Sequence, residues 1–329
     1  MVSSAGLTAA TSGLAPRTAH RPGAAPATPA GRLRQPTIAE LLREGSRPLF
    51  SFELFPAKDE VQDRQLWQTV RELEALGPDF VSVTYGANGS SRDRTIRATE
   101  AIAQHTTLRA VAHLTCASQS RAQLRQVIGS YAAAGIRHIL AIRGDMPGGP
   151  TVPWERHRDG LANATELVAM VRELGDFCIG VAAFPDLHPE RHDPDLDARI
   201  LVDKARAGAD FAITQLFFTP SRYFDLVARV RALGCDIPII PGIMPVTRYS
   251  QIKRFAELSG ADLPVAVTDR LSAVVDDEQQ VRAVGIELAT ELCQDLLAGG
   301  APGLHFITMN RSPATREIYA KVRSELRRG

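Results

Sequence analysis

Short apolar segments alternate with helical patterns along almost the whole chain, and this alternation limits the possible folds more than any other feature. Each of the eight segments has seven or eight residues rich in aliphatic and β-branched side chains. They are 49–55 (LFSFELF), 80–86 (FVSVTYG), 109–116 (RAVAHLTC), 138–144 (HILAIRG), 178–184 (CIGVAAF), 211–217 (FAITQLF), 238–244 (PIIPGIM) and 303–309 (GLHFITM). Segments of this length and composition are typical of strands buried on both faces of a parallel sheet.

The intervening stretches have helical periodicity. Leu66, Val70 and Leu73 follow the i, i+4, i+7 spacing of one helix face, and the same spacing recurs at residues 167, 171 and 174. Further helices are expected over residues 250–258 and 279–298. Five helices are expected to end in a left-handed glycine just before the next strand. These glycines are Gly77, Gly135, Gly175, Gly208 and Gly234.

Eight strands that alternate with helices predict an α/β fold, a (β/α)8 TIM barrel, over residues 37–329. A doubly wound open sheet is the alternative, but it usually has fewer strands and its first turn commonly carries GxGxxG, which this chain lacks. Residues 1–36 are rich in Ala, Pro and Arg and contain no carboxylate. We expect this leader to be disordered, and its composition also resembles a transit peptide, although its prolines disfavour a continuous helix.

The composition excludes several classes of function. With 38 basic and 37 acidic side chains the net charge is +1, so no field of one sign would recruit nucleic acid or a membrane surface. No apolar run approaches the roughly 20 residues of a membrane-spanning helix. The four cysteines are scattered without a CxxC pair, which indicates reduced thiols and a cytoplasmic protein. A homo-oligomer is compatible with this composition.

Glu53 is the most informative residue at a strand end. It lies within an apolar strand, between Phe52 and Leu54. Chemistry in barrels of this type takes place at the carboxyl ends of the strands. A carboxyl group in an apolar barrel mouth is expected to have a raised pKa, which suits a general acid near neutral pH. The alternative is a glutamate that faces a polar partner between the barrel and a helix.

The tripeptide Arg143-Gly144-Asp145 follows the fourth predicted strand. An adhesion motif would need a flexible loop on a secreted protein, and neither condition fits. We expect Gly144 to let the backbone turn sharply, so that Asp145 overhangs the barrel mouth. The alternative is a surface ion pair between Arg143 and Asp145.

Other polar residues at strand ends allow both structural and functional interpretations. His113 is either a core histidine or a ligand contact, and no second metal-ligating residue stands beside it, so no metal is expected. Gln215 would be buried in a central strand, where a planar heterocycle or a backbone group could satisfy its amide. The loop at residues 84–95 (TYGANGSSRDRT) would permit close approach of a phosphate or cofactor. Asp197 and Lys204 share a helix face and would by default be solvated.

Eight motifs in order resemble the bacterial type of methylenetetrahydrofolate reductase. They are FELFPAKDE, SVTYGANGSSRDRT, HLTC, LAIRGDMP, FPDLHPE, KARAGADFAITQLFF, PIIPGIMP and HFITMNRS, and they extend from about Phe50 to Arg311. The resemblance implies a barrel that holds FAD and uses NADH or NADPH to reduce 5,10-methylenetetrahydrofolate to 5-methyltetrahydrofolate in two half-reactions. The folate and the nicotinamide would occupy the same space in turn.

The resemblance also implies roles for individual residues. Glu53 aligns with the general acid, and Asp145 aligns with the aspartate near the flavin and the folate. Gln215 would hold the pterin, and Tyr249 would stack on the nicotinamide or the folate. Met309 and Arg311 line up with the folate side. Flavin contacts fall on Thr84, Tyr85, His113, Arg143, Gly144, Asp145, Asn163, Asp197 and Lys204, which makes the last two ligands instead of solvated charges.

Two departures from the family pattern bear on the cofactor. Asn163 and Ile307 stand where tyrosines are common. One alternative is therefore a flavin-poor relative that reduces folate directly from NAD(P)H, and another is a non-catalytic folate-binding barrel. The chain stops soon after the last predicted helix, so inhibition by adenosylmethionine is not expected.

Overall fold

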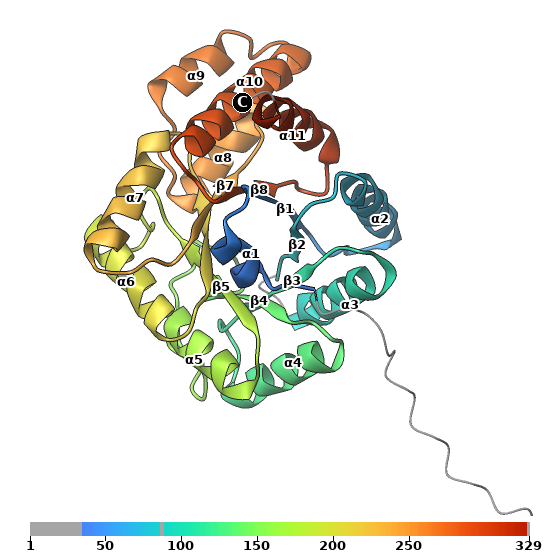
Figure 1. The fold of residues 1–329 in the computed structure, drawn as a ribbon, viewed down its shortest axis with the longest axis vertical. Helices are drawn as coiled ribbons and strands as arrows, with labels where there is room; N and C mark the ends of the chain where they lie inside the picture. Colours follow the sequence, from blue (N-terminus) through green and yellow to red (C-terminus); the bar gives the residue numbers. More distant parts are fainter. Residues whose placement is uncertain (1–34, 86–88, 328–329) are drawn as a thin grey trace, which may run out of the picture. The chain divides into compact units, whose positions relative to one another are not determined.

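The structure is a computed structural model that describes residues 35–85 and 89–327. Its eight strands are all parallel and pair in chain order into a closed barrel, so the predicted TIM barrel is confirmed (Figure 1). Each strand lies in one of the eight apolar segments. The strands are β1 Leu49–Leu54, β2 Phe80–Val83, β3 Ala110–Thr115, β4 His138–Ile142, β5 Cys178–Ala183, β6 Phe211–Leu216, β7 Ile239–Ile243 and β8 Gly303–Ile307.

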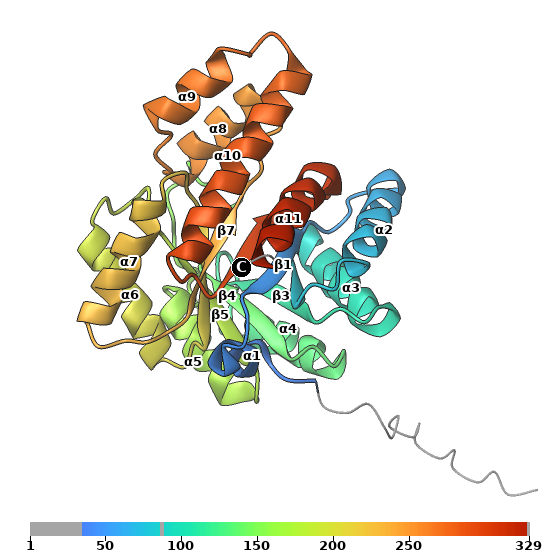
Figure 2. The same ribbon diagram turned by 45° about the horizontal axis from the view of Figure 1, so that its top comes forward.

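Helices surround this barrel on the outside (Figures 1 and 2). Helix α1 Ile38–Glu44 lies at one end of the barrel, and the other helices are α2 Glu60–Glu74, α3 Gly89–His105, α4 Arg121–Ala133, α5 Ala164–Leu174, α6 Pro194–Arg206, α7 Pro220–Ala232, α8 Tyr249–Ser259, α9 Val265–Ser272, α10 Glu278–Ala298 and α11 Ser312–Leu326. The helices predicted over 250–258 and 279–298 are confirmed as α8 and α10. Helices α1 and α9 were not expected from the sequence.

Helix α1 closes the amino end of the barrel instead of joining the outer ring. In Figure 1 it lies in the middle of the ring of strands, and Figure 2 shows it beneath them. Ile38 is fully buried in an apolar layer with Leu49, Phe80 and Phe211, each of which begins or nearly begins its strand. The Ile38 backbone N–H also donates to His138 Nε2 at 3.4 Å. The amino end is therefore filled by side chains, and the functional groups lie at the other end.

The sequence Gly-x-Asp-Phe occurs twice, before β2 and before β6, and it fastens neighbouring strands. Asp79 accepts a hydrogen bond from the Phe50 backbone N–H at 2.8 Å and pairs with Arg47. Asp210 accepts one from the Ile179 backbone N–H at 2.7 Å and pairs with Arg172 at 2.8 Å. Each carboxylate thus connects the start of its strand to the preceding strand.

Four of the five glycines expected at helix ends adopt left-handed backbone, at φ +63° for Gly77, +74° for Gly135, +114° for Gly208 and +72° for Gly234. The prediction for Gly175 is wrong, because its φ is 172°, which is extended backbone. Close packing gives a different reason for a glycine there. A Cβ at this position would lie 2.9 Å from Cε2 of the Phe177 ring.

Some expectations fall outside the described residues. The leader at 1–36 lies there almost entirely and remains a prediction. Of the loop predicted over 84–95, residues 86–88 lie outside the described residues, and the prediction is wrong from Gly89 onward, where α3 begins. All four cysteines are free, and Cys116, Cys178 and Cys293 are buried. Within residues 35–85 and 89–327, no helix is both long enough and apolar enough to cross a bilayer.

Candidate functional site

Glu53 lies near the carboxyl end of β1, and two histidines from other strands face it. Its Oε2 atom is 3.7 Å from Nε2 of His113 on β3 and 3.8 Å from Nε2 of His305 on β8. The Glu53 side chain is 16% exposed, whereas the histidine side chains are 6% and 1% exposed. The carboxylate therefore points into the barrel, and the alternative position between the barrel and a helix is excluded.

The turn after β8 holds the backbone on both sides of Glu53. The Thr308 hydroxyl donates to the Glu53 carbonyl at 2.6 Å. The Asn310 side chain accepts from the Phe55 N–H and donates to the Phe55 carbonyl, both at 2.8 Å. Met309 and Asn310 reach this geometry with φ near +52° and +53°, a conformation that non-glycine residues seldom adopt. Local strain thus accompanies a tight clamp on the strand that carries Glu53.

The electrostatics of Glu53 correct the expectation of a raised pKa. Burial alone would raise it, but the contacts with His305 and His113 outweigh burial, and the pKa of Glu53 lies below its ordinary value. Burial lowers the pKa of His113 to about 4, so this imidazole is neutral at pH 7. Its Nε2 atom is buried without a hydrogen-bond partner among the described residues. The raised pKa was expected for an isolated carboxyl group, whereas Glu53 has His305 as a partner.

His305 is the residue that the sequence analysis did not single out. Its Nδ1 atom lies 2.8 Å from the Ser51 hydroxyl, and its Nε2 atom lies 3.4 Å from the Ser82 hydroxyl. The signal was a histidine inside the apolar stretch GLHFI, two positions before Ile307. Strand alternation alone could have placed it in the barrel interior.

Asp145 lies beyond the end of β4, at the same end of the barrel as Glu53. Gly144 has φ +80°, and a Cβ there would lie 2.6 Å from Thr115 Cβ, so the expected sharp turn at glycine is present. Arg143 pairs with Glu190 through two bonds of 2.6 Å and stacks over the Trp154 ring at 5.3 Å. The alternative Arg143–Asp145 ion pair is therefore not the arrangement seen. Asp145 is exposed, but partial loss of solvation at the barrel mouth raises the pKa of its carboxyl group. The positive charge of Arg143 opposes this shift.

Asp197 and Lys204 are buried, so the default prediction of solvated charges is wrong. Asp197 accepts from the His188 backbone N–H at 3.0 Å and pairs with Arg191 at 2.6 Å. Lys204 Nζ donates to the Ala182 carbonyl at 2.8 Å at the end of β5. Burial lowers the pKa of Lys204 to about 8, and Arg191 adds to this while Asp197 opposes it. The face of α6 that carries Asp197 and Lys204 is turned toward the barrel. The i, i+7 spacing shows that the two residues share a face but not which way that face is turned.

The remaining predicted contacts occupy loops and strand ends. The Thr84 carbonyl accepts from the Thr95 hydroxyl at 2.9 Å, and the Tyr85 hydroxyl lies 3.5 Å from Gln119 Oε1. Asn163 is the N-cap of α5, and its side chain accepts from the Glu166 N–H at 3.0 Å. Gln215 is only half-buried, and its Oε1 atom accepts from the Leu216 backbone N–H at 2.9 Å.

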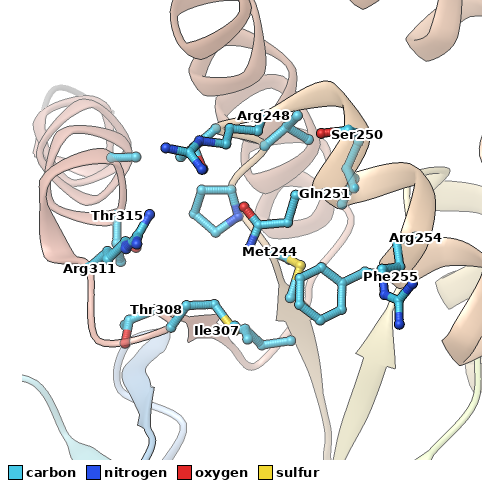
Figure 3. Close-up of a pocket in the computed structure, with 16 residues that line it drawn as sticks. Met244, Arg248, Ser250, Gln251, Arg254, Phe255, Ile307, Thr308, Arg311 and Thr315 are labelled. Atoms are coloured by element: carbon cyan, nitrogen blue, oxygen red, sulfur yellow. The ribbon is translucent and has the colours of Figure 1, made fainter. Parts of the chain in front are cut away.

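Met309 and Arg311 line a cavity of about 550 Å³ between the β7–α8 and β8–α11 connections (Figure 3). Tyr249 is the first residue of α8 and packs against the apolar cluster that contains Val246, Ile252 and Leu271. The structure thus brings Met309 and Arg311 together in the connection after β8, whereas Tyr249 begins the helix after β7 and does not line this cavity. Within the described residues no cluster of metal-ligating side chains is found.

The family model described as methylenetetrahydrofolate reductase matches residues 37–323. The 5,10-methylenetetrahydrofolate reductase of Pectobacterium carotovorum subsp. carotovorum is 39% identical over 270 residues, which cover 82% of this chain and 88% of that protein. That of Escherichia coli (strain K12) is 38% identical over 268 residues, with the same two coverages.

A solved structure shares the fold at much lower sequence identity. It is an uncharacterized Clostridium thermocellum protein described as binding two copies of 5-methyl-5,6,7,8-tetrahydrofolic acid. It has a TM-score of 0.59 and 12% identity, and the alignment covers 88% of this chain and 99% of that one. This likeness supports the barrel fold, whereas the family model and the two bacterial relatives carry the assignment. Together with the eight-stranded barrel, they show that the chain belongs to the methylenetetrahydrofolate reductase family.

Proposed function

We propose that this protein reduces 5,10-methylenetetrahydrofolate to 5-methyltetrahydrofolate, with NADH or NADPH as reductant and FAD as bound cofactor. Family membership supports the reaction class. The observation that carries the proposal is the Glu53 carboxylate, held inside the barrel mouth within 4 Å of two buried imidazoles. Burial of a carboxylate costs free energy unless polar partners compensate it. A protein that only bound folate would not need this costly group in its interior.

The residues at the ends of β4 and β5 fit a flavin dinucleotide. Arg191 and Arg143 both lie within electrostatic range of Lys204, and the hydrogen bond from Lys204 to the Ala182 carbonyl uses only one of its three donors. Such a set suits a diphosphate. The unpartnered Nε2 atom of His113 is a further buried polar group available to a ligand. When bound, FAD would accept a hydride from the nicotinamide and supply it to the methylene carbon of the folate.

Glu53 would supply the proton that assists ring opening of the methylene folate. Because the pKa of Glu53 lies below its ordinary value, the carboxylate needs a proton source when the folate enters. His305 contacts both Glu53 and the Ser51 hydroxyl, so polar groups adjoin the carboxylate inside the barrel. A cationic folate intermediate would be favoured by the negative charge of Asp145 at the same barrel end.

The first experiment is purification, a spectrum at 450 nm, and an assay of NADH oxidation with the methylene folate. Glu53→Gln is expected to lower kcat by roughly 10²–10⁴-fold and to change folate affinity little. Glu60→Gln is the matched control, since Glu60 is an exposed residue of α2. A colourless protein that binds folate without oxidising either nicotinamide would indicate a non-catalytic barrel, and unchanged turnover in Glu53→Gln would remove the assigned role.

The cap at Asn163 favours a second candidate function, direct reduction of folate without flavin. Asparagine has no ring to stack on a flavin, and this side chain is engaged as the cap of its own helix. The two candidates differ in one measurement, the thermal unfolding midpoint with and without added FAD. A raised midpoint supports the flavoprotein, and an unchanged midpoint combined with folate-dependent NADH oxidation supports direct transfer.

A further inference from the structure

The loop between β4 and α5 is fixed near both of its ends. At its start, the Arg143 carbonyl accepts a hydrogen bond from the Cys116 backbone N–H at 3.1 Å. Near its other end, the Asp159 carbonyl accepts one from the Arg121 backbone N–H at 2.8 Å. Gly160 follows, where an added Cβ would lie 2.5 Å from a backbone carbonyl oxygen, so glycine permits the close contact with the start of α4. The loop therefore has a defined path at the carboxyl end of β4.

Trp154 lies in the middle of this loop and carries a buried donor that is not used. Its ring is partly buried and packs against the main apolar core. Its Nε1 atom is buried and has no hydrogen-bond partner among the residues that the structure describes. An indole N–H can only donate, and a buried donor that is left unsatisfied lowers the free energy of unfolding. A ligand that accepts a hydrogen bond from this N–H would remove that cost.

The Trp154 ring is covered by the guanidinium group of Arg143. The guanidinium carbon lies 5.3 Å from the ring centroid, which is a cation–π contact. Both terminal nitrogens of Arg143 bond to Glu190 at 2.6 Å. The Glu190 side chain is 43% exposed, and an ion pair that is open to solvent is weak enough for another anion to replace. An anion that takes over Arg143 would turn the guanidinium and bring the indole N–H within reach.

The cations near Arg143 indicate which kind of acceptor fits. The charges of Arg143 and Arg191 both act on Lys204, and all three side chains can only donate hydrogen bonds. The indole N–H of Trp154 adds a fourth donor of this kind beside Arg143. Several donors in one region suit an oxyanion with many acceptor oxygens, and a diphosphate has more of these than a single carboxylate. The diphosphate of FAD was placed beside the same three cations above.

We propose that Trp154 is a cofactor-binding residue, which donates its indole N–H to the diphosphate of FAD and orients Arg143 toward the same group. The inference rests on the proposed function, because it takes FAD to be the cofactor. It assigns a role to a residue that neither the strand ends nor the family motifs indicated. It also gives the cofactor an aromatic neighbour that Asn163 does not supply.

The test compares FAD with riboflavin, which has the same ring system but no phosphate, by calorimetric titration of the full-length protein prepared without flavin. Trp154→Phe keeps a ring and removes the N–H, so it should weaken FAD binding about fivefold and leave riboflavin binding unchanged. Trp154→Ala should weaken FAD binding by about threefold more, because the contact with Arg143 is lost as well. Trp67→Phe is the matched control, since Trp67 is the other tryptophan of the chain and lies on α2, and it should keep both affinities.

The thermal unfolding midpoint without ligand separates a binding role from a structural one. Trp154→Phe removes a buried donor that has no partner, so its midpoint should equal or exceed that of the unaltered protein. A lowered midpoint, together with an equal loss of affinity for FAD and riboflavin, would show that Trp154 only supports the loop and would overturn the inference.

The remaining outcomes are also distinguishable. Unchanged FAD affinity in both Trp154 variants would refute the inference and leave the proposed function intact. A raised KM for NADH with unchanged FAD affinity would assign the indole to the nicotinamide co-substrate instead. Absence of FAD binding to the unaltered protein would refute the flavin part of the proposed function itself.

Discussion

Replacement of Gly144 by alanine tests how the Asp145 loop is built. The glycine adopts φ +80°, where an L-residue is strained by roughly 1–2 kcal/mol. An added Cβ would also lie 2.6 Å from Cβ and 2.8 Å from Cγ2 of Thr115, which is closer than real contacts allow. Overpacking of a well-packed site costs about 1–3 kcal/mol. The two effects together predict a loss of about 2–5 kcal/mol in the free energy of unfolding.

Gly234→Ala is the matched control for this variant. Gly234 has φ +72°, but nothing lies within 4 Å of a Cβ built there, so only the backbone term of roughly 1–2 kcal/mol applies. Urea unfolding, followed by circular dichroism at 222 nm, gives both free energies. If the two variants lose the same stability, the contact with Thr115 contributes nothing and the reasoning about Gly144 is refuted.

The close approach of residue 144 to Thr115 also predicts a functional effect of Gly144→Ala. Because Asp145 follows directly, the backbone shift that relieves the contact with Thr115 must move its carboxylate. Activity should therefore fall at temperatures where the variant is still folded, whereas Gly234→Ala should keep activity under those conditions. Full activity of the folded Gly144→Ala protein would show that the position of Asp145 is not critical.

Two further predictions concern stability. His113, His138 and His188 have folded-state pKa values of about 4, 3 and 4, lowered by burial from 6.5, so the unfolded chain binds protons first as the pH falls. The contribution of these histidines to the free energy of unfolding is complete above pH 6.5 and is lost progressively toward pH 4, by roughly 1.4 kcal/mol per pH unit for each histidine. Urea unfolding at several pH values should show that the free energy of unfolding depends less steeply on pH in His138→Gln, and an unchanged dependence would count against the assignment. Asp79→Ala should destabilise the barrel by about 2–3 kcal/mol and Asp210→Ala by less, because the Asp79 carboxylate is 5% exposed and that of Asp210 is 30% exposed. Urea unfolding of the two variants measures both losses, and a larger loss in Asp210→Ala would contradict the prediction.

The barrel could be predicted from the sequence because its strands are buried on both faces. A mainly apolar segment of seven or eight residues, repeated eight times between helical patterns, has few other solutions. The two missed helices have weaker signals. Helix α1 spans only Ile38–Glu44 beside a leader of unusual composition, and α9 spans only Val265–Ser272 in the long interval before α10. Short helices depend on tertiary packing more than on their own periodicity.

The candidate site was predicted less completely, for a physical reason. Glu53 was found because a carboxylate inside an apolar run is conspicuous, but its pKa depends on His305, which is 252 positions away in the chain and adjacent in the barrel. Asp197 and Lys204 had a known spacing but no known orientation. Local sequence shows which groups are present, and the closure of the sheet determines which of them meet.

The position of α1 has a consequence for how ligands enter and leave the barrel. Since Ile38 and the apolar layer around it fill the amino end, a compound that reaches Glu53 has to arrive and depart through the opposite opening. Two co-substrates that react at the same interior carboxylate would therefore share one route, and the product of the first would have to clear it before the second could come in. A helix of seven residues, remote from every group that does chemistry, would in this way impose the sequence of events.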